Sequence, residues 1–76
     1  MARYFLHIWD GNKRIADVDG QDFAIFEEAR AEAVESARDL FSERFRSGKD
    51  VSEYAIELAN ETGEILARID LHNFSK

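Results

Sequence analysis

The sequence predicts an α+β domain in which a four-stranded mixed sheet packs against one long helix, in the order ββαββ. Three observations support this prediction. Apolar residues recur at spacings of three and four between residues 26 and 46, which is helical periodicity. Short strand-like segments flank this stretch on both sides, and the motifs DGNK and NETG have the composition of tight turns. We expect one small domain over residues 1–76, because so short a chain builds one modest core.

Composition excludes several kinds of function. The chain has no cysteine, so it forms no disulfide and offers no thiolate to zinc or to a substrate. Its net charge of −6 disfavours nucleic acid and anionic membranes as partners. No apolar run is long enough for a membrane helix or for the core of a signal peptide. We therefore expect a soluble cytoplasmic protein with no cofactor, no metal and no membrane partner.

The boundaries of the elements follow from apolar periodicity and turn residues. We expect strands over residues 3–9, 14–18, 53–59 and 64–71, and a helix over residues 26–46. Gly48 is a natural residue just beyond the helix, and Asp22 is a candidate for its N-cap. Because a 21-residue helix outreaches seven-residue strands, Phe41 and Phe45 should overhang the sheet. We expect the segment SGKDVSEY to fold back so that Val51 covers them.

The first strand is apolar on both sides, which is typical of a central strand. This favours the strand order 2-1-4-3, with the first and last strands parallel, in a β-grasp-like arrangement. The order 2-1-3-4 remains the alternative. One helix covers one face, to which we assign Tyr4, Leu6, Ile8, Ile15, Ile56, Leu58, Ile65, Ile69 and Leu71. The uncovered face then carries Phe5, His7, Trp9, Ala16, Ala55, Ala59, Leu66, Arg68 and Asp70.

The opening RYFLHIWDG resembles a family of short alphaproteobacterial proteins, common in rhizobia, with an R-Y-F-x-H-x-x-D-G start. The resemblance covers nearly the whole chain. The matching positions are Arg3, Tyr4, Phe5, His7, Asp10, Gly11, Asp17, Gly20, the EARAEA run from Glu28 to Ala33, Ile56, Glu57 and Gly63. Trp9 departs from the charged residue expected in that family, and Ile25 from a helix-capping one. The resemblance implies membership of an uncharacterised family and no particular activity.

Few residues carry chemistry. His7 is the only residue of the opening motif that exchanges protons near neutral pH, and we expect it to be a hydrogen-bonded structural residue. The motif DVDGQD looks like a calcium loop, but Ile15 and Phe26 stand where an EF-hand needs ligands, so a turn with a helix N-cap explains it better. Carboxylates at positions 28, 32, 35, 39 and 43 form one acidic stripe on the helix, which we interpret as a solvated face.

These features predict a non-catalytic interaction domain that is not an enzyme. We expect it to self-associate as a homo-oligomer or to bind a protein through the uncovered sheet face. The predicted binding residues are Phe5, His7, Trp9, Leu66 and Arg68. The alternative is binding of single-stranded nucleic acid on an aromatic platform of Phe5, His7 and Trp9.

Overall fold

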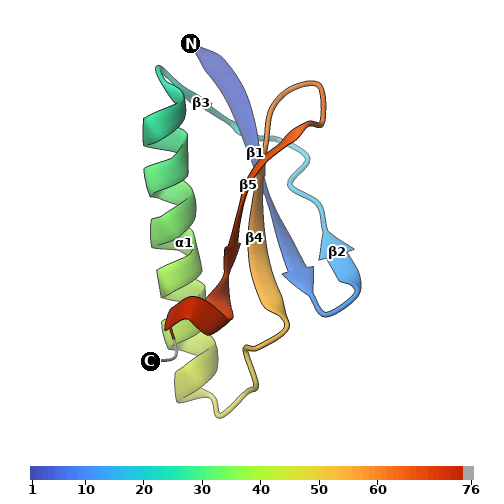
Figure 1. Cartoon of the computed structure of the whole chain (residues 1–76), viewed down its shortest axis with the longest axis vertical. Helices are drawn as coiled ribbons and strands as arrows, with labels where there is room; N and C mark the ends of the chain where they lie inside the picture. The colour runs from blue at the N-terminus through green and yellow to red at the C-terminus, as the bar shows by residue number, and fades with distance from the viewer. Residues whose placement is uncertain (75–76) are drawn as a thin grey trace.

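The computed structural model describes residues 1–74 and shows an α+β fold (Figure 1). One long helix lies against an antiparallel sheet of five strands within these residues. The elements are β1 (Ala2–Asp10), β2 (Lys13–Ile15), β3 (Gln21–Phe23), α1 (Phe26–Arg46), β4 (Tyr54–Ala59), β5 (Ile65–Asp70) and the 3₁₀ turn η1 (Leu71–Phe74).

The strand order is β2-β1-β4-β5, and β3 pairs with the start of β1. The predicted mixed sheet, the order 2-1-4-3 and the β-grasp-like topology are therefore wrong, and the alternative order 2-1-3-4 describes the three pairings among β2, β1, β4 and β5. The reason is the direction in which the strands before and after the helix run. The strand before α1 runs antiparallel to β1, and the helix returns the chain so that β4 also runs antiparallel to β1. Antiparallel pairing with β1 is then available directly and is slightly the more stable kind.

The second predicted strand is also shorter than expected and is followed by an additional one. Strand β2 ends at Ile15, and β3 occupies residues 21–23, where we expected a loop. Asp22, the candidate N-cap, lies in β3 and pairs across the ladder with Arg3. The helix instead starts after Ile25, whose side chain makes no capping hydrogen bond. The backbone N–H of Ala24 donates to the Glu28 carboxylate at 3.2 Å, which ties the entry segment to the first turn.

The predicted helix over residues 26–46 is confirmed, and most of the residues assigned to the face it covers lie in or against the core beneath it. Ala29, Ala33 and Ala37 are fully buried, because their small side chains let the helix lie close to the sheet. They form a core with Tyr4, Ile56, Leu58, Val51 and Leu71. Ile65 does not share that face: a bulge pairs it with Ala59, and it is 44% exposed.

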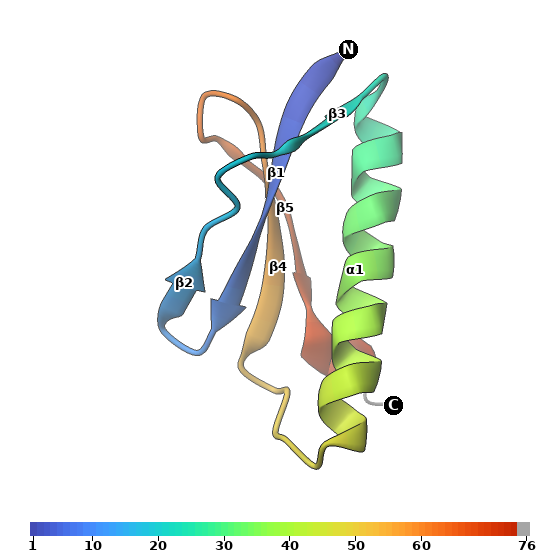
Figure 2. The same ribbon diagram turned by 180° about the vertical axis from the view of Figure 1, so that it is seen from behind.

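The overhanging end of the helix is covered in part. Val51 is buried, as expected, and Phe74 of η1 packs against Phe41 with the ring centroids 6.1 Å apart. Phe45 stacks on Phe41 at 5.6 Å but remains 67% exposed. Gly48 ends the helix with a φ of 74°. In Figure 2, η1 and the 47–53 segment lie at the C-terminal end of α1. This end of the core is therefore closed by one segment that precedes β4 in the chain and by another that follows β5.

Candidate interaction surface

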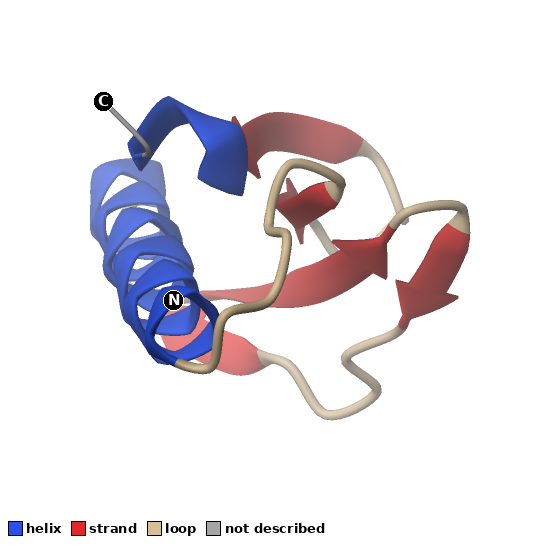
Figure 3. Cartoon of the chain, turned by 90° about the horizontal axis from the view of Figure 1, so that it is seen from below, coloured by secondary structure: helices blue, strands red, loops and turns tan. Residues whose placement is uncertain are grey.

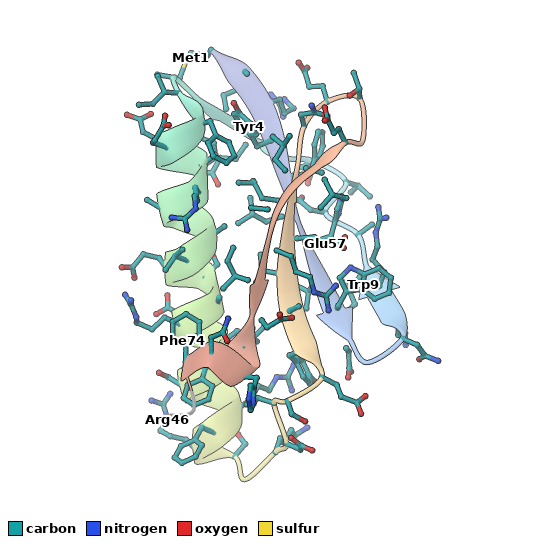
Figure 4. The ribbon with its side chains drawn as sticks, viewed as in Figure 1. Met1, Tyr4, Trp9, Arg46, Glu57 and Phe74 are labelled. Atoms are coloured by element: carbon teal, nitrogen blue, oxygen red, sulfur yellow. The ribbon has the colours of Figure 1, made fainter. Side chains whose placement is uncertain are left out.

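The face of the sheet opposite α1 is the candidate site, and we call it the second face. Strand pairing arranges its residues in three cross-strand rows. The rows are Arg14–Trp9–Ala55–Asp70, His7–Glu57–Arg68 and Phe5–Ala59–Ile65. Figure 4 shows Trp9 on the side of the sheet remote from the helix. The fold therefore brings four of the five predicted binding residues onto one surface.

Leu66, the fifth predicted residue, has no place in these rows. The bulge in the pairing of β4 with β5 makes Leu66 the extra residue between Ile65 and Ala67. It is 36% exposed. Ile65 takes the row position next to Ala59 that strict alternation would have given to Leu66. Nothing in the local sequence marks this bulge, so strict alternation along the strand assigned Ile65 to the wrong side and gave Leu66 a row position that it does not occupy.

The loop over residues 16–20 covers part of the second face. The Asp17 backbone N–H donates to Nδ1 of His7 at 3.0 Å. The Asp17 carboxylate accepts from the backbone N–H of Leu6 at 3.1 Å and from that of Gly20 at 3.1 Å. Gly20 has a φ of 72°, and a Cβ there would lie 2.8 Å from the Phe5 ring. The motif DVDGQD is therefore a tight turn tied to β1 that leads into β3, and it covers part of the apolar side of β1 opposite the helix.

His7 is held neutral inside this arrangement. It is 7% exposed, and burial lowers its pKa, with the Arg14 guanidinium adding to the effect and Asp17 and Glu57 opposing it. Because Nδ1 accepts the Asp17 N–H, the ring proton belongs on Nε2. Arg14 lies 3.4 Å from that nitrogen, where donor faces donor, so the contact is packing and charge rather than a strong hydrogen bond. These contacts fix the orientation of the His7 ring against the 16–20 loop.

The Asp17 carboxylate is held in its charged form. Burial acts to raise its pKa, but hydrogen bonds from the backbone N–H groups of Gly20, Leu6 and Asp19 outweigh burial, and the pKa is lowered. A charged acceptor for three backbone donors fixes the loop more firmly than a neutral one. Together with His7, Asp17 makes the 16–20 loop an integral part of the sheet.

Trp9 and Phe5 are both half-buried on the second face, and charged groups surround Trp9. Arg68 donates to Asp70 at 3.0 Å and lies 3.6 Å from Glu57, whose side chain is only 13% exposed. Arg14 pairs with Trp9 across β1 and β2. The Trp9 indole N–H is buried without a hydrogen-bond partner within residues 1–74. An aromatic ring therefore shares this face with two arginines and two carboxylates, of which the sequence pattern assigned Arg68 and Asp70 to the face and only Arg68 to the predicted binding residues.

A polar hollow of about 580 Å³ adjoins this surface at the β1–β2 turn. It is lined by Asp10, Gly11, Asn12, Glu53 and Arg68. The Gly11 N–H donates to the Glu53 carbonyl at 2.9 Å, which closes the floor of the hollow. Arg68 belongs both to the hollow and to the second face, so the surface around Trp9 continues into a concave end.

Residues 3–72 match a protein family described as a domain of unknown function, DUF6894. The chain belongs to this family. Membership agrees with the expectation of an uncharacterised family drawn from the opening motif. Neither a curated protein nor a solved structure matches the chain.

Within residues 1–74, no helix is both long and apolar enough to cross a membrane. Among those residues no three histidines, aspartates or glutamates gather as metal ligands.

Proposed function

We propose that this DUF6894 domain is a non-catalytic interaction domain that binds a protein chain through its second face. The observation that carries the proposal is the half-buried Trp9, which pairs across the strands with Arg14 and Ala55 and shares a sheet face without a covering helix with Arg68. Tryptophan and arginine are the residue types that most often dominate protein interfaces. The neighbouring Glu57 and Asp70 supply the polar rim that such interfaces carry.

The chemistry of His7 favours binding over catalysis. A general base needs a nitrogen lone pair that is open to the substrate. In His7 the unprotonated nitrogen is Nδ1, and its lone pair already accepts a hydrogen bond from the Asp17 N–H. The same contact weakens the nucleic-acid alternative. Phe5 and His7 lie parallel, with interplanar angle 12° and centroids 6.3 Å apart, and His7 is covered by the loop. A stacking platform needs accessible ring faces, and the net charge of −6 opposes phosphate.

A second copy of the chain is the simplest partner to test, because the second face carries both signs of charge. Arg14 and Asp70 stand at opposite ends of one cross-strand row. A two-fold axis parallel to the strands would set each Arg14 opposite the Asp70 of the other copy. Such an isologous contact is the commonest interface in soluble oligomers. Trp9 and Ala55 would lie between the two charge pairs.

The test is the mass of the protein in solution, measured by light scattering over a range of concentrations. We expect the wild type to exceed the 8.8 kDa of one chain and Trp9→Glu to return to it, because a carboxylate buried without a partner is costly. Phe45→Glu is the matched control, since Phe45 is an exposed aromatic outside the second face. A wild type that stays monomeric would contradict self-association through the second face. Equal loss of mass in both variants would contradict a specific role for Trp9.

A further inference from the structure

A groove on the other side of the sheet is separate from the second face. It lies between α1 and the helix-facing side of β1 and β4, with a volume of about 340 Å³. Its lining residues are Ile8, Ser36, Asp39, Leu40, Glu43 and Ile56. We call it the helix–sheet groove. No residue of the groove belongs to the rows that form the second face.

The groove exists because the helix is displaced toward one edge of the sheet. The helix packs mainly on β4, β5 and η1, whereas β2 lies farthest from it (Figure 3). The helix-facing side of β2 is therefore left open. Ile15 pairs with Ile8 and is 50% exposed, so the apolar floor of the groove continues outward onto β2. An apolar strip of this kind beside a helix is a typical seat for an amphipathic segment.

The rim of the groove is acidic, and its negative charge is not balanced by ion pairs within residues 1–74. Positions 32, 36, 39 and 43 share one side of the helix, so Glu32 extends the line of Asp39 and Glu43. Neither Asp39 nor Glu43 forms an ion pair within residues 1–74. Two nearby helix cations contact other partners: Arg38 contacts Glu35 and the Phe74 ring, and Arg44 contacts the Tyr54 ring at 5.2 Å.

We propose that the helix–sheet groove binds a cationic amphipathic segment of a partner protein. The apolar side of the segment would rest on Ile8, Ile15 and Leu40, and its lysines or arginines would meet Asp39 and Glu43. Charge complementarity favours this occupant over a second copy, because each copy carries a net charge of −6. Lys13, two residues before Ile15, is the one positive charge on the helix-facing side of β2. This proposal stands independently of the function proposed for the second face.

The test uses a fluorescein-labelled peptide in which leucines and lysines recur at helical spacing, with binding followed by fluorescence anisotropy. We expect the wild type to bind it and Asp39→Lys/Glu43→Lys to bind at least about tenfold more weakly, which corresponds to roughly 1.4 kcal/mol. Glu27→Lys/Glu61→Lys is the matched control. It changes the net charge by the same amount at carboxylates outside the groove, and we expect its affinity to stay within about threefold of the wild type.

Two further binding measurements test whether the attraction is nonspecific and whether the second face takes part in peptide binding. A peptide with every leucine replaced by serine should lose binding, because the apolar floor contributes as well as the rim. Trp9→Glu should bind the original peptide like the wild type, since Trp9 lies on the opposite side of the sheet. The proposal is overturned by no binding to the wild type, by equal loss in the two charge-reversed proteins, or by loss in Trp9→Glu. It is also overturned if Asp39→Lys/Glu43→Lys lowers the mass of a wild-type oligomer, which would assign the groove to a second copy.

Discussion

The two sides of β1 have nearly the same apolar composition but meet very different surroundings. On the helix side, Tyr4, Leu6 and Ile8 pack against the alanine face of α1 and the branched residues of β4. On the other side, Phe5 and His7 meet the polar 16–20 loop, and Trp9 lies among charged groups. Apolar character on both sides of a strand thus does not imply two hydrophobic cores. A short loop held by hydrogen bonds between backbone N–H groups and side chains can cover part of one side while a helix buries the other.

The largest difference in stability should appear between a leucine of the core under α1 and a leucine of the β5 bulge, outside that core. Leu58 is fully buried under α1, and Leu58→Ala should lower the free energy of unfolding by about 2–5 kcal/mol. Leu66 is 36% exposed in the bulge, and Leu66→Ala should lower it by less than about 1 kcal/mol. Urea denaturation of both variants measures the contrast. Similar losses would mean that Leu66 belongs to the core.

Two glycines test whether the 16–20 loop is packed on the sheet. Both Gly20 and Gly63 have positive φ, at 72° and 87°. A Cβ at Gly20 meets the Phe5 ring and the Tyr4 carbonyl below 3.0 Å, whereas a Cβ at Gly63 meets nothing within 4 Å. Gly63→Ala should cost about 1 kcal/mol for backbone strain alone. Gly20→Ala should cost more, by a further 1–3 kcal/mol or so. Equal unfolding free energies in urea would contradict a packed loop.

His7 should give the second face a pH dependence that the helix face lacks. Its pKa is lowered from 6.5 in the folded protein, chiefly by burial, so the unfolded chain binds the proton more readily. The contribution of His7 to stability is therefore full above pH 6.5 and is lost as pH falls from 6.5 through the folded pKa. His7→Asn keeps an acceptor but does not titrate. The stability advantage of the wild type over His7→Asn should shrink with acid, measured by urea unfolding, and growth of that advantage would contradict the neutral assignment.

The sequence predicted the helix, the terminal strands and the helix-covered face well, because periodicity of 3.6 or 2 reports directly on which side of an element is apolar. It failed where the outcome depends on pairing. Strand order follows from the direction in which β3 enters the helix, and the three residues of β3 carry no strand pattern. The exchange between Ile65 and Leu66 follows from a bulge. The binding of Asp17 to His7 joins residues ten apart and leaves no local pattern.

For the candidate site, the sequence predicted the aromatic residues together with Arg68 and Asp70, but it did not predict that Glu57 lies among them. Phe5, His7 and Trp9 stand out because they alternate along one strand. Arg14, Glu57 and Asp70 become their neighbours only through the registers of β2, β4 and β5. Register is set by turn geometry and by bulges, which a single sequence specifies weakly. The sequence therefore predicted charges of both signs on this face, through Arg68 and Asp70, but not how they are arranged around Trp9.

The most direct test that the surface around Trp9 is covered by another chain is the emission of Trp9 itself. Trp9 is the only tryptophan in the sequence, so fluorescence reports on this surface alone. As protein concentration rises toward the millimolar range, self-association through the second face should shift the emission to shorter wavelength, in step with the rise in mass. Leu66 and Phe45 lie outside the rows that contain Trp9, so their replacement by glutamate should leave the shift intact. A rise in mass at constant emission would place the interface elsewhere and contradict the role proposed for Trp9.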